Sequence, residues 1–430
     1  MRNLLVVTAV VAAGLGALSV HRAEAGARRG PDVRPVDVPA ADAQSVLDGN
    51  AAFALESYAL LAAEPGNLVY SPLSASTALS MVMAGARGET RDQLAAALHL
   101  TLPADRADAA FQSALASLRP LSAGVSLQIA NSAWVSDGFS LQPGFASLLR
   151  RSYGAQARRV DFFGHPGDAA ARINAWASQH TRRLIPKVIS PDGIDPATKL
   201  LVANAVSLSA KWAQPFREDG GDGPFAARDG SLVTARMMTE KSTFPLYADP
   251  GVLTHDPFGP LPSPTSVAVL ELPYRGGDWS MVVVLPARPD GLAAVEASLT
   301  PEKLRAWIDA AVPTVVNVAL PRFAIESSFD LVPAMKSLGA TDVFDSSGGA
   351  DLSGIGAAPG ELYVGLLAQK ARIRVDAKGT EAAAVTTVGF VVTSVDPTPV
   401  FRADHPFLYV VRHRPTGTIL FIGRVEDPTK

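Results

Sequence analysis

Residues 376–400 read DAKGTEAAAVTTVGFVVTSVDPTPV, and this stretch constrains the interpretation of the whole chain. Residues 376–381 are polar and predict that the stretch begins with a flexible segment. The next fourteen residues, 382–395, carry no charge and are small, β-branched or apolar except for Thr and Ser. Asp396-Pro397-Thr398-Pro399 then favours extended backbone, because the helical conformation is disfavoured for a residue that precedes proline.

The uncharged part of this stretch suits a β-strand without being committed to one. Read with a period of two, one face carries no charge and is small enough for a sheet core. Alanine is a poor strand former and a good helix former, so residues 382–384 do not fix the conformation in advance. A segment with two stable positions would need this pattern, although an ordinary hairpin or a loose helix also fits it. The uncharged face comprises Thr380, Ala382, Ala384, Thr386 and Val388, and the other face Glu381, Ala383, Val385 and Thr387.

The composition of the whole chain is that of a globular protein with a large core. Of its 430 residues, 48% are hydrophobic and 18% are charged, which argues against global disorder. The net charge of −3 argues against general binding to nucleic acid or anionic membranes. The chain has no cysteine, which excludes disulfides, thiolate zinc sites, iron–sulfur clusters and a cysteine nucleophile.

The N-terminus resembles a secretory signal peptide over residues 1–25. Arg2 precedes an apolar run, Leu4 to Val20, and Ala23-Glu24-Ala25 supplies a small-x-small cleavage site. We therefore expect a secreted, extracellular protein, or a periplasmic one if the source is a Gram-negative bacterium; an uncleaved membrane anchor is the alternative. The composition, rich in Ala, Arg, Gly and Pro, suggests a bacterial source. After cleavage we expect no membrane association.

The remaining sequence predicts one mixed α+β domain, residues 46–430, after a flexible segment at 26–45. Helices and strands occur in blocks rather than in strict alternation, which favours largely antiparallel sheets. Ser71 and Pro72 are a predicted helix cap and first turn. Helices are predicted over 46–63, 75–86, 90–100 and 107–118, and strands over 125–135, 199–208, 267–272, 280–285 and 315–320, with a hairpin formed by 407–411 and 419–422.

Several motifs, in the same order and spacing, give the chain a resemblance to the serpin family. Two of them are highly specific: Leu201-Val202-Ala203-Asn204-Ala205-Val206 with Lys211-Trp212, and Asp404-His405-Pro406-Phe407-Leu408 with Gly423-Arg424-Val425. Others are moderately specific, and the resemblance spans nearly the whole chain after residue 46. These are Asn67 to Ser74, Gly85 to Thr90, Ala130 to Val135 and Ile173-Asn174-Ala175-Trp176.

The resemblance implies the serpin fold, with three β-sheets, about nine helices and an exposed reactive-centre loop near the C-terminus. It also implies a protein that is not an enzyme and needs no cofactor or metal. The expected partner is a serine protease, which would be held in a covalent acyl-enzyme complex after the cut loop inserts into the central sheet. We expect a monomer. The implied loop hinge, whose small residues fit inhibitory members, is Gly379, Thr380, Glu381, Ala382, Ala383 and Ala384.

The family spacing from the hinge glycine implies a reactive bond between Thr393 and Ser394. If the spacing differs by one residue in either direction, the reactive bond is Val392–Thr393 or Ser394–Val395. Each choice offers a small or β-branched residue to the protease, so an elastase-like or subtilisin-like target fits. A trypsin-like target does not fit, because residues 382–395 contain no Lys or Arg.

The resemblance also implies positions that control how the central strands part. Ser71, Ser74, Asn204 and Gln369 match the region called the shutter, and Trp212 matches the breach at the top of that sheet. Two positions depart from the family pattern: Gln369 replaces a histidine, and Ala377 replaces a glutamate whose basic partner would be Arg322. Core packing and capping are the plainer interpretation of the same residues.

Two other classes of function fit the sequence less well. An exported hydrolase would need a G-x-S-x-G, S-x-x-K or H-E-x-x-H motif, and none occurs. A serpin that does not inhibit, and acts as a binding or chaperone-like protein, is the alternative within the family; the small hinge residues argue against it. The basic pairs Arg150-Arg151, Arg158-Arg159 and Arg182-Arg183 fit solvated surface charge better than a polyanion site.

Overall fold

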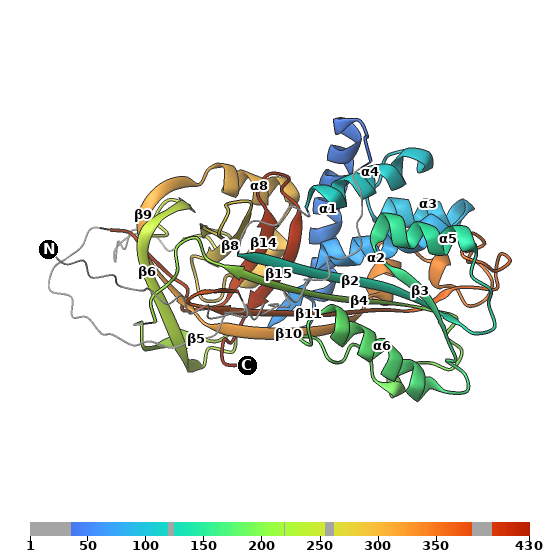
Figure 1. Ribbon diagram of the computed structural model, residues 1–430. Helices are drawn as coiled ribbons and strands as arrows, with labels where there is room; N and C mark the ends of the chain where they lie inside the picture. Colours follow the sequence, from blue (N-terminus) through green and yellow to red (C-terminus); the bar gives the residue numbers. More distant parts are fainter. Residues whose placement is uncertain (1–35, 119–123, 219, 254–261, 381–397) are drawn as a thin grey trace, which may run out of the picture.

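The computed structural model describes residues 36–118, 124–218, 220–253, 262–380 and 398–430 (Figure 1). Within these ranges the chain forms nine α-helices and short helical turns at Leu149–Tyr153, Pro191–Gly193 and Asp342–Phe344. The α-helices are α1 (Ala40–Leu61), α2 (Pro72–Gly85), α3 (Gly88–Ala97), α4 (Ala104–Ser117), α5 (Pro143–Leu148), α6 (Pro166–His180), α7 (Leu292–Ala297), α8 (Pro301–Asp309) and α9 (Val332–Ser337).

A six-stranded central sheet runs through the middle of the molecule (Figure 1). Its strands follow the order β10-β11-β12-β4-β2-β3, with β11 also pairing directly with β4. Three of them are long, and Val, Ile, Leu and Ala fill much of both faces of the sheet centre. The bounds are β10 (Phe323–Asp330), β11 (Val364–Asp376), β12 (Gly379–Thr380), β4 (Leu200–Lys211), β2 (Val125–Ser136) and β3 (Gln156–Val160).

The other nine strands form two sheet regions that share the long strand β6. The end of β6 pairs with β7, whereas most of its length pairs with β9 and its start with β5. The predicted three sheets are therefore confirmed, with two of them joined through β6. The bounds are β1 (Leu68–Tyr70), β15 (Ile419–Val425), β14 (Phe407–His413), β8 (Trp279–Pro286), β7 (Val267–Pro273), β6 (Leu232–Ala248), β9 (Val312–Pro321), β13 (Val400–Arg402) and β5 (Asp222–Ala226).

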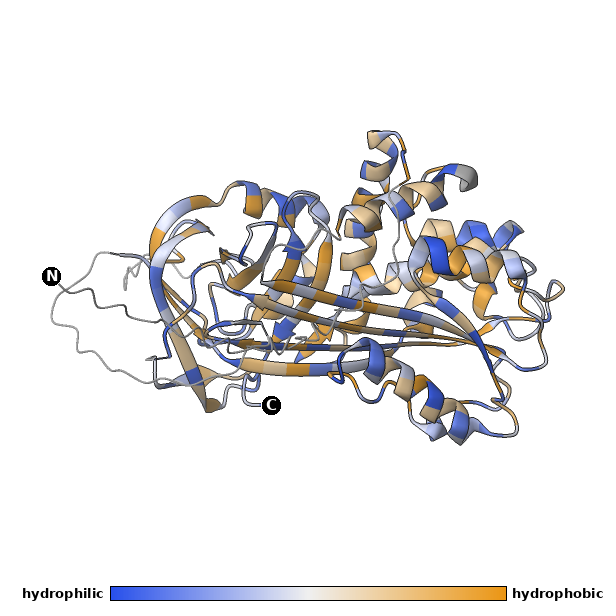
Figure 2. Cartoon of the chain, viewed as in Figure 1, coloured by the Kyte–Doolittle hydropathy of each residue, from blue (hydrophilic) through white to orange (hydrophobic). Residues whose placement is uncertain are grey.

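Helix α2 lies at the centre of the main core. It contacts β15, β4 and β2, and all of its residues except Ala84 are buried. A helix surrounded by protein needs small and apolar side chains all round, and the sequence of α2 supplies them. Figure 2 shows apolar residues interrupted by polar ones along the central strands.

A second, separate apolar cluster covers the opposite face of the central sheet. Figure 1 shows α6 on that face, away from α1 to α5. Ile173 and Trp176 of α6 pack with Trp134 of β2 and Leu201 of β4. The sheet is therefore buried on both faces at this end, by two cores that do not merge.

Most elements predicted from the sequence are present, and the start of the first helix differs. Strands β14 and β15 form the predicted hairpin, with Gly417 in the left-handed conformation (φ 73°) at the turn. Helix α1 starts at Ala40, so residues 40–45 are helical rather than part of a flexible segment. Buried Asp42 pairs there with Arg106 of α4, a long-range contact that holds the first turn. Among the described residues, no helix is long and apolar enough to cross a bilayer.

Candidate functional site

The candidate site is the seam between the parallel strands β4 and β11 of the central sheet. The two strands pair from Leu200 opposite Val364 to Ser207 opposite Arg372. Beyond that point they diverge, and the two-residue strand β12 lies between them. Gly379 pairs with Asp376 and Lys211, and Thr380 with Val375 and Ala210. The seam is thus closed along most of its length and open at one end, where the predicted hinge begins.

Gly379 fits between the strands only because it lacks a side chain. Its φ is 157°, and a Cβ atom would lie 2.0 Å from the carbonyl oxygen of Ala210. Any larger residue would push the hinge out of the sheet. Thr380 is fully buried, and its Oγ1 lies 2.8 Å from the hydroxyl of Tyr274. Burial raises the pKa of Tyr274, so this hydroxyl stays protonated and can bond to Thr380.

Trp212 fixes the turn that connects β11 to β12. Its indole nitrogen donates to the carbonyl of Asp376 at 2.9 Å, and its backbone N–H donates to the carbonyl of Lys378 at 3.0 Å. The indole stacks on Tyr274, with ring centroids 4.6 Å apart and an interplanar angle of 7°. Phe216 packs edge-on against the same indole. The open end of the seam is therefore held by aromatic packing and main-chain bonds.

At the departure Ala377, the basic residue expected to lose its partner is paired elsewhere. Ala377 is buried, and its carbonyl accepts the N–H of Phe216 at 2.8 Å. Arg322, the cation expected to lack its partner, pairs with Glu218 at 3.0 Å. A carboxylate from a different loop thus replaces the one that the sequence comparison expected at 377.

A row of amide side chains crosses the sheet in the closed part of the seam. Asn131 of β2 lies opposite Asn204 of β4, and Asn204 lies opposite Gln369 of β11. The Asn204 amide donates to the carbonyl of Ser74 at 3.1 Å and to two closer acceptors, Ser74 Oγ and Asn131 Oδ1. Asn204 Oδ1 is buried, and none of the described residues bonds to it. This row joins the sheet to the first turn of α2.

Gln369 makes a two-way bond to Ser71 in the same place. Gln369 Oε1 accepts the backbone N–H of Ser71, and its Nε2 donates to the Ser71 carbonyl, both at 3.0 Å. The Ser71 hydroxyl donates to the carbonyl of Leu420 at 2.7 Å. Ser71 occupies the N-cap position of α2, but its side chain does not cap the helix, contrary to the prediction. Pro72 follows it, and β15 offers a buried acceptor that attracts the hydroxyl instead.

The structure therefore brings together Ser71, Ser74, Asn204 and Gln369 at one end of α2, and places Trp212 with Gly379 and Thr380 at the open end of the seam. Sequence reasoning did not select Asn131 for this group. The signal lay in its position within Ala130 to Val135, since a polar residue in an apolar strand needs a partner. The remaining hinge residues, Glu381 and Ala382 to Ala384, and the expected reactive bond Thr393–Ser394 lie outside the described residues.

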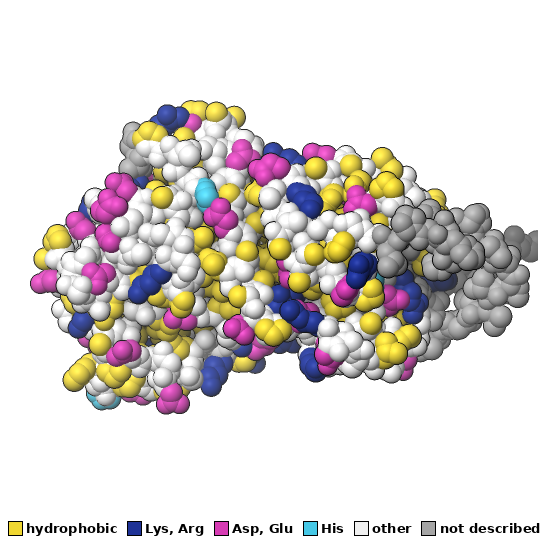
Figure 3. Space-filling view, turned by 180° about the vertical axis from the view of Figure 1, so that it is seen from behind, with side chains coloured by type: hydrophobic (Ala, Val, Ile, Leu, Met, Phe, Trp, Pro, Cys, Tyr) yellow, Lys and Arg dark blue, Asp and Glu magenta, His cyan; other side chains and the backbone are white. Residues whose placement is uncertain are grey.

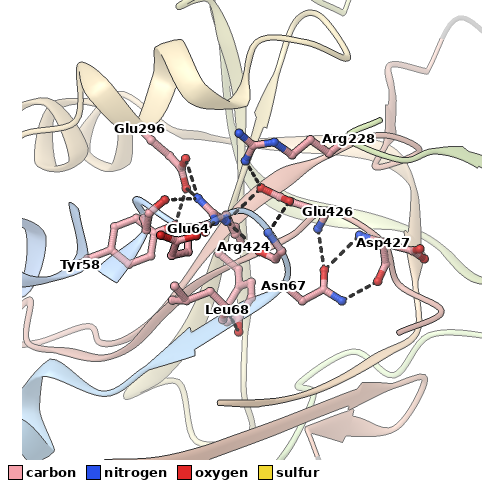
Figure 4. A network of polar contacts seen from close by, with 12 residues as sticks. Tyr58, Glu64, Asn67, Leu68, Arg228, Glu296, Arg424, Glu426 and Asp427 are labelled. Carbon is pink, nitrogen blue, oxygen red and sulfur yellow. Dashed lines mark hydrogen bonds and ion pairs between the residues drawn. The ribbon is translucent and has the colours of Figure 1, made fainter. Parts of the chain in front are cut away.

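A second polar network lies beyond the seam, around the buried Arg424 of β15 (Figure 4). Arg424 pairs with Glu296 of α7 at 3.2 Å and with Glu426 at 3.1 Å. Tyr58 donates to Glu296 at 2.5 Å, and burial followed by the Glu296 charge raises the pKa of this phenol. Arg228 also pairs with Glu426, at 2.5 Å. The network ties α1 and α7 to the C-terminal strand.

An open cavity of about 770 Å³ adjoins this network, between β10, the turn after β5 and the C-terminal residues. Its buried carboxylates already have partners. Glu426 accepts the N–H of Gly66 at 2.7 Å besides its ion pairs, and Asp427 pairs with Lys430 at 3.1 Å. Within the described part of the chain, no three His, Asp or Glu side chains gather as a metal site would require. On the face drawn in Figure 3, acidic and basic side chains are interspersed.

Comparison with known proteins agrees with this geometry. The family model for "Serpin (serine protease inhibitor)" matches residues 48–428. The leukocyte elastase inhibitor of Bos taurus is 36% identical over 370 residues, which cover 84% of this chain and 93% of that protein. The human leukocyte elastase inhibitor is 33% identical over 394 residues, covering 90% of this chain and 100% of that protein.

Comparison with solved structures points to the same family. The crystal structure of Serpin48 from the insect Tenebrio molitor superposes with a TM-score of 0.77 at 28% identity, covering 91% of this chain and all of that one. The chain therefore belongs to the serpin family of serine protease inhibitors, as the sequence motifs predicted.

Proposed function

We propose that this protein inhibits serine endopeptidases by trapping them: the protease cuts the reactive loop, and the loop then inserts between β4 and β11. The observation that supports this proposal most directly is that Gly379 and Thr380 already lie between these strands, in antiparallel register with both. The first two residues of the proposed inserted strand therefore already lie in place in the uncut molecule. Because the proposed role is that of a substrate and a conformational trap, the protein needs no catalytic group of its own.

Extending the register of β12 supports this proposal. Thr380 faces the buried side of the sheet, so every second residue after it would face the same side. Those residues, Ala382, Ala384, Thr386 and Val388, are uncharged. Continued along both neighbours, the register brings Thr386 opposite both Gln369 and Asn204. A hydroxyl there is able to donate to Asn204 Oδ1, the buried acceptor that lacks a partner among the residues the structure describes.

The outer face of the proposed inserted strand is also compatible with its neighbours in the sheet. Glu381 would lie beside Arg374 of β11, an exposed cation on the outer face. Each inserted residue gains main-chain hydrogen bonds with β4 or β11, and the small apolar side chains leave water. The free energy released would distort the attached protease and slow deacylation.

The test is to mix the purified mature protein with pancreatic elastase and with subtilisin. We expect an SDS-stable band near the summed masses and a released peptide that starts at Ser394. Cleavage with neither a stable complex nor a gain in thermal stability would refute inhibition and favour a binding or chaperone-like role. Cleavage with a large gain in thermal stability but no complex would support insertion and would exclude these two proteases as targets. The same sample on a sizing column tests the proposed monomer.

We also propose that the protein is secreted, on the evidence of the first 25 residues. N-terminal sequencing of protein recovered outside the producing cells is expected to start at Gly26. Recovery of a membrane-bound form with an intact N-terminus would refute cleavage.

A further inference from the structure

Four exposed basic side chains lie together at the open end of the seam, and they are called the cation row here. They are Lys211 at the end of β4, Arg275 in the turn between β7 and β8, Lys378 in the turn between β11 and β12, and Arg374 of β11. They come from separate segments of the chain, so no short window of sequence reveals the group.

Main-chain pairing fixes the order of these cations across the end of the sheet. The N–H of Arg275 donates to the carbonyl of Lys211 at 2.8 Å. Gly379, next to Lys378, pairs with Lys211 on one side and with Asp376 of β11 on the other. Since neighbouring strands lie about 4.8 Å apart, three strand spacings make the row roughly 14 Å long.

The row contains side chains that point away from the main core. Ala210 and Val375 are buried in that core, so the alternation of a strand turns Lys211 and Arg374 toward the outer face. Helix α6 also lies on the outer face, but it packs on Leu201 near the other end of β4 (Figure 1). All four cations are exposed, so a ligand can reach them from solvent.

The positive charge of the row is largely uncompensated. Within the part of the chain that the structure describes, no carboxylate forms an ion pair with any of its four side chains. Lys370, on the same face of β11, by contrast pairs with Glu326 at 2.5 Å. Asp376 is the acidic residue at the junction; it is buried, and it accepts the Lys378 N–H at 2.9 Å. One carboxylate thus stands against four cations.

We propose that the cation row binds a linear polyanion, a chain of phosphate or sulfate groups, and that loop insertion weakens this binding. Lysine and arginine both bind such groups through charge-assisted hydrogen bonds. A row of roughly 14 Å suits several anionic groups in sequence better than one small anion. The net charge of the whole chain is −3, so the attraction is local to this end of the sheet. The row is distinct from the basic pairs at 150–151, 158–159 and 182–183.

The effect of insertion rests on the proposed function. Continuing the register of β12 would bring Glu381 opposite Arg374 once the loop inserts. Its carboxylate would lie on the outer face, within the row, and would compete with the polyanion for that cation. By linkage, a polyanion that prefers the uncut form opposes insertion by the same free energy. The uncut inhibitor would therefore be held on a polyanionic surface and released from it after trapping.

Binding is measured first on the uncut protein, which needs no protease. The probes are inorganic polyphosphate and dextran sulfate, titrated at low and at high salt, with pyrophosphate as the short anion. We expect both chains to bind more tightly than pyrophosphate and to bind less tightly at high salt. Whichever of the two chains binds more tightly identifies the source of the anionic groups. Binding no tighter than that of pyrophosphate would overturn the site.

Paired substitutions locate the site. Lys211→Gln combined with Arg275→Gln should weaken binding of the chain about tenfold. Lys378→Gln combined with Arg374→Gln should act alike, and this pair replaces the first if the first fails to fold.

The matched control removes two cations from a basic pair outside the row. Arg150→Gln combined with Arg151→Gln should leave the affinity within about twofold of the wild type. Equal affinities in the control and in both row variants would assign the binding to general surface charge and overturn the site.

The effect of insertion is measured on protein whose loop has been cut and which has become resistant to heat. Its affinity for the chain should be about fivefold lower than that of the uncut protein, and Glu381→Gln should remove this difference. Equal affinities of cut and uncut wild type would overturn the coupling. A wild type that never gains heat resistance would refute the proposed function and the release step with it, whereas the titration of the uncut protein decides the site in either case.

Discussion

Gln369 and Ser71 exchange two hydrogen bonds of 3.0 Å each, and this pair connects the seam strand β11 to the first turn of α2. Both residues are almost completely buried. Neither group changes charge in the physiological range, so the junction is expected to be insensitive to pH.

Gln369→His is expected to make this junction pH-dependent. A buried imidazole favours its neutral form, so its pKa falls below that of the unfolded chain. The contribution to stability is then present above about pH 6.5 and is lost as the pH falls below that value. The measurement is urea unfolding of wild type and variant between pH 5 and 8. A difference between the two that stays constant across this range would contradict the prediction, and Gln369→Leu controls for loss of the amide.

Trp212→Phe is expected to destabilise the uncut protein by about 1–2 kcal/mol, because the carbonyl of buried Asp376 loses its indole donor while stacking on Tyr274 largely remains. Chemical unfolding of the uncut protein measures the loss. Trp279→Phe is a suitable comparison, since its buried indole nitrogen bonds to no residue in the described part of the chain, so the substitution removes no bond seen there. Equal losses in the two variants would mean that packing, rather than the bond, stabilises the turn.

Ala384→Glu and Ala383→Glu form a pair that tests the faces of the inserted strand. In the proposed inserted strand, continuing the register of β12 would turn Ala384 toward the core and Ala383 toward the outer face. A carboxylate forced into the core is costly, so Ala384→Glu should convert the inhibitor into a plain substrate. Ala383→Glu should retain most of the trapping. The ratio of SDS-stable complex to cleaved protein is the readout, and equal behaviour of the two variants would refute the register.

His413 is expected to make the stability of the wild type fall in mild acid. Burial lowers the pKa of this imidazole, which packs against Trp279 and bonds to Thr416. The unfolded chain therefore binds the proton more readily, and the contribution is present above about pH 6.5 and lost below it. Thermal unfolding from pH 5 to 8 should show a smaller loss in His413→Gln than in wild type. A parallel loss in both proteins would assign the effect to other groups.

The parts of the fold with strong local patterns were predictable, and those that depend on register between strands were not. The all-round apolar character of α2 and the turn before Ile419 are visible in short windows of sequence. The pairing of Asn131 with Asn204 is not visible in this way, because it depends on which residues two distant strands place opposite each other. The ion pair of Arg322 with Glu218 likewise joins segments about a hundred residues apart.

The site was predictable only where the family motif fixed a residue's neighbours. The family motif grouped Ser71 with Asn204 and placed Trp212 in a separate region, but it gave no sign that the acceptor of the Ser71 hydroxyl is Leu420, which lies 349 residues away. The start of α1 was missed for a similar reason. Residues 40–45 show little periodicity of their own, and the pairing of Asp42 with Arg106 depends on a helix that follows much later.

The strand β1 pairs with β15 alone, with Leu68 opposite Arg424, and α2 packs on the same strand. Residues near 68 thus wait until residues near 424 have left the ribosome before their core can close. Contacts of such long sequence separation are slow to form, because the loop between them must first be closed. The nascent chain therefore spends most of its synthesis without its final core. Truncation within the last ten residues should prevent folding altogether rather than shorten one edge of the molecule.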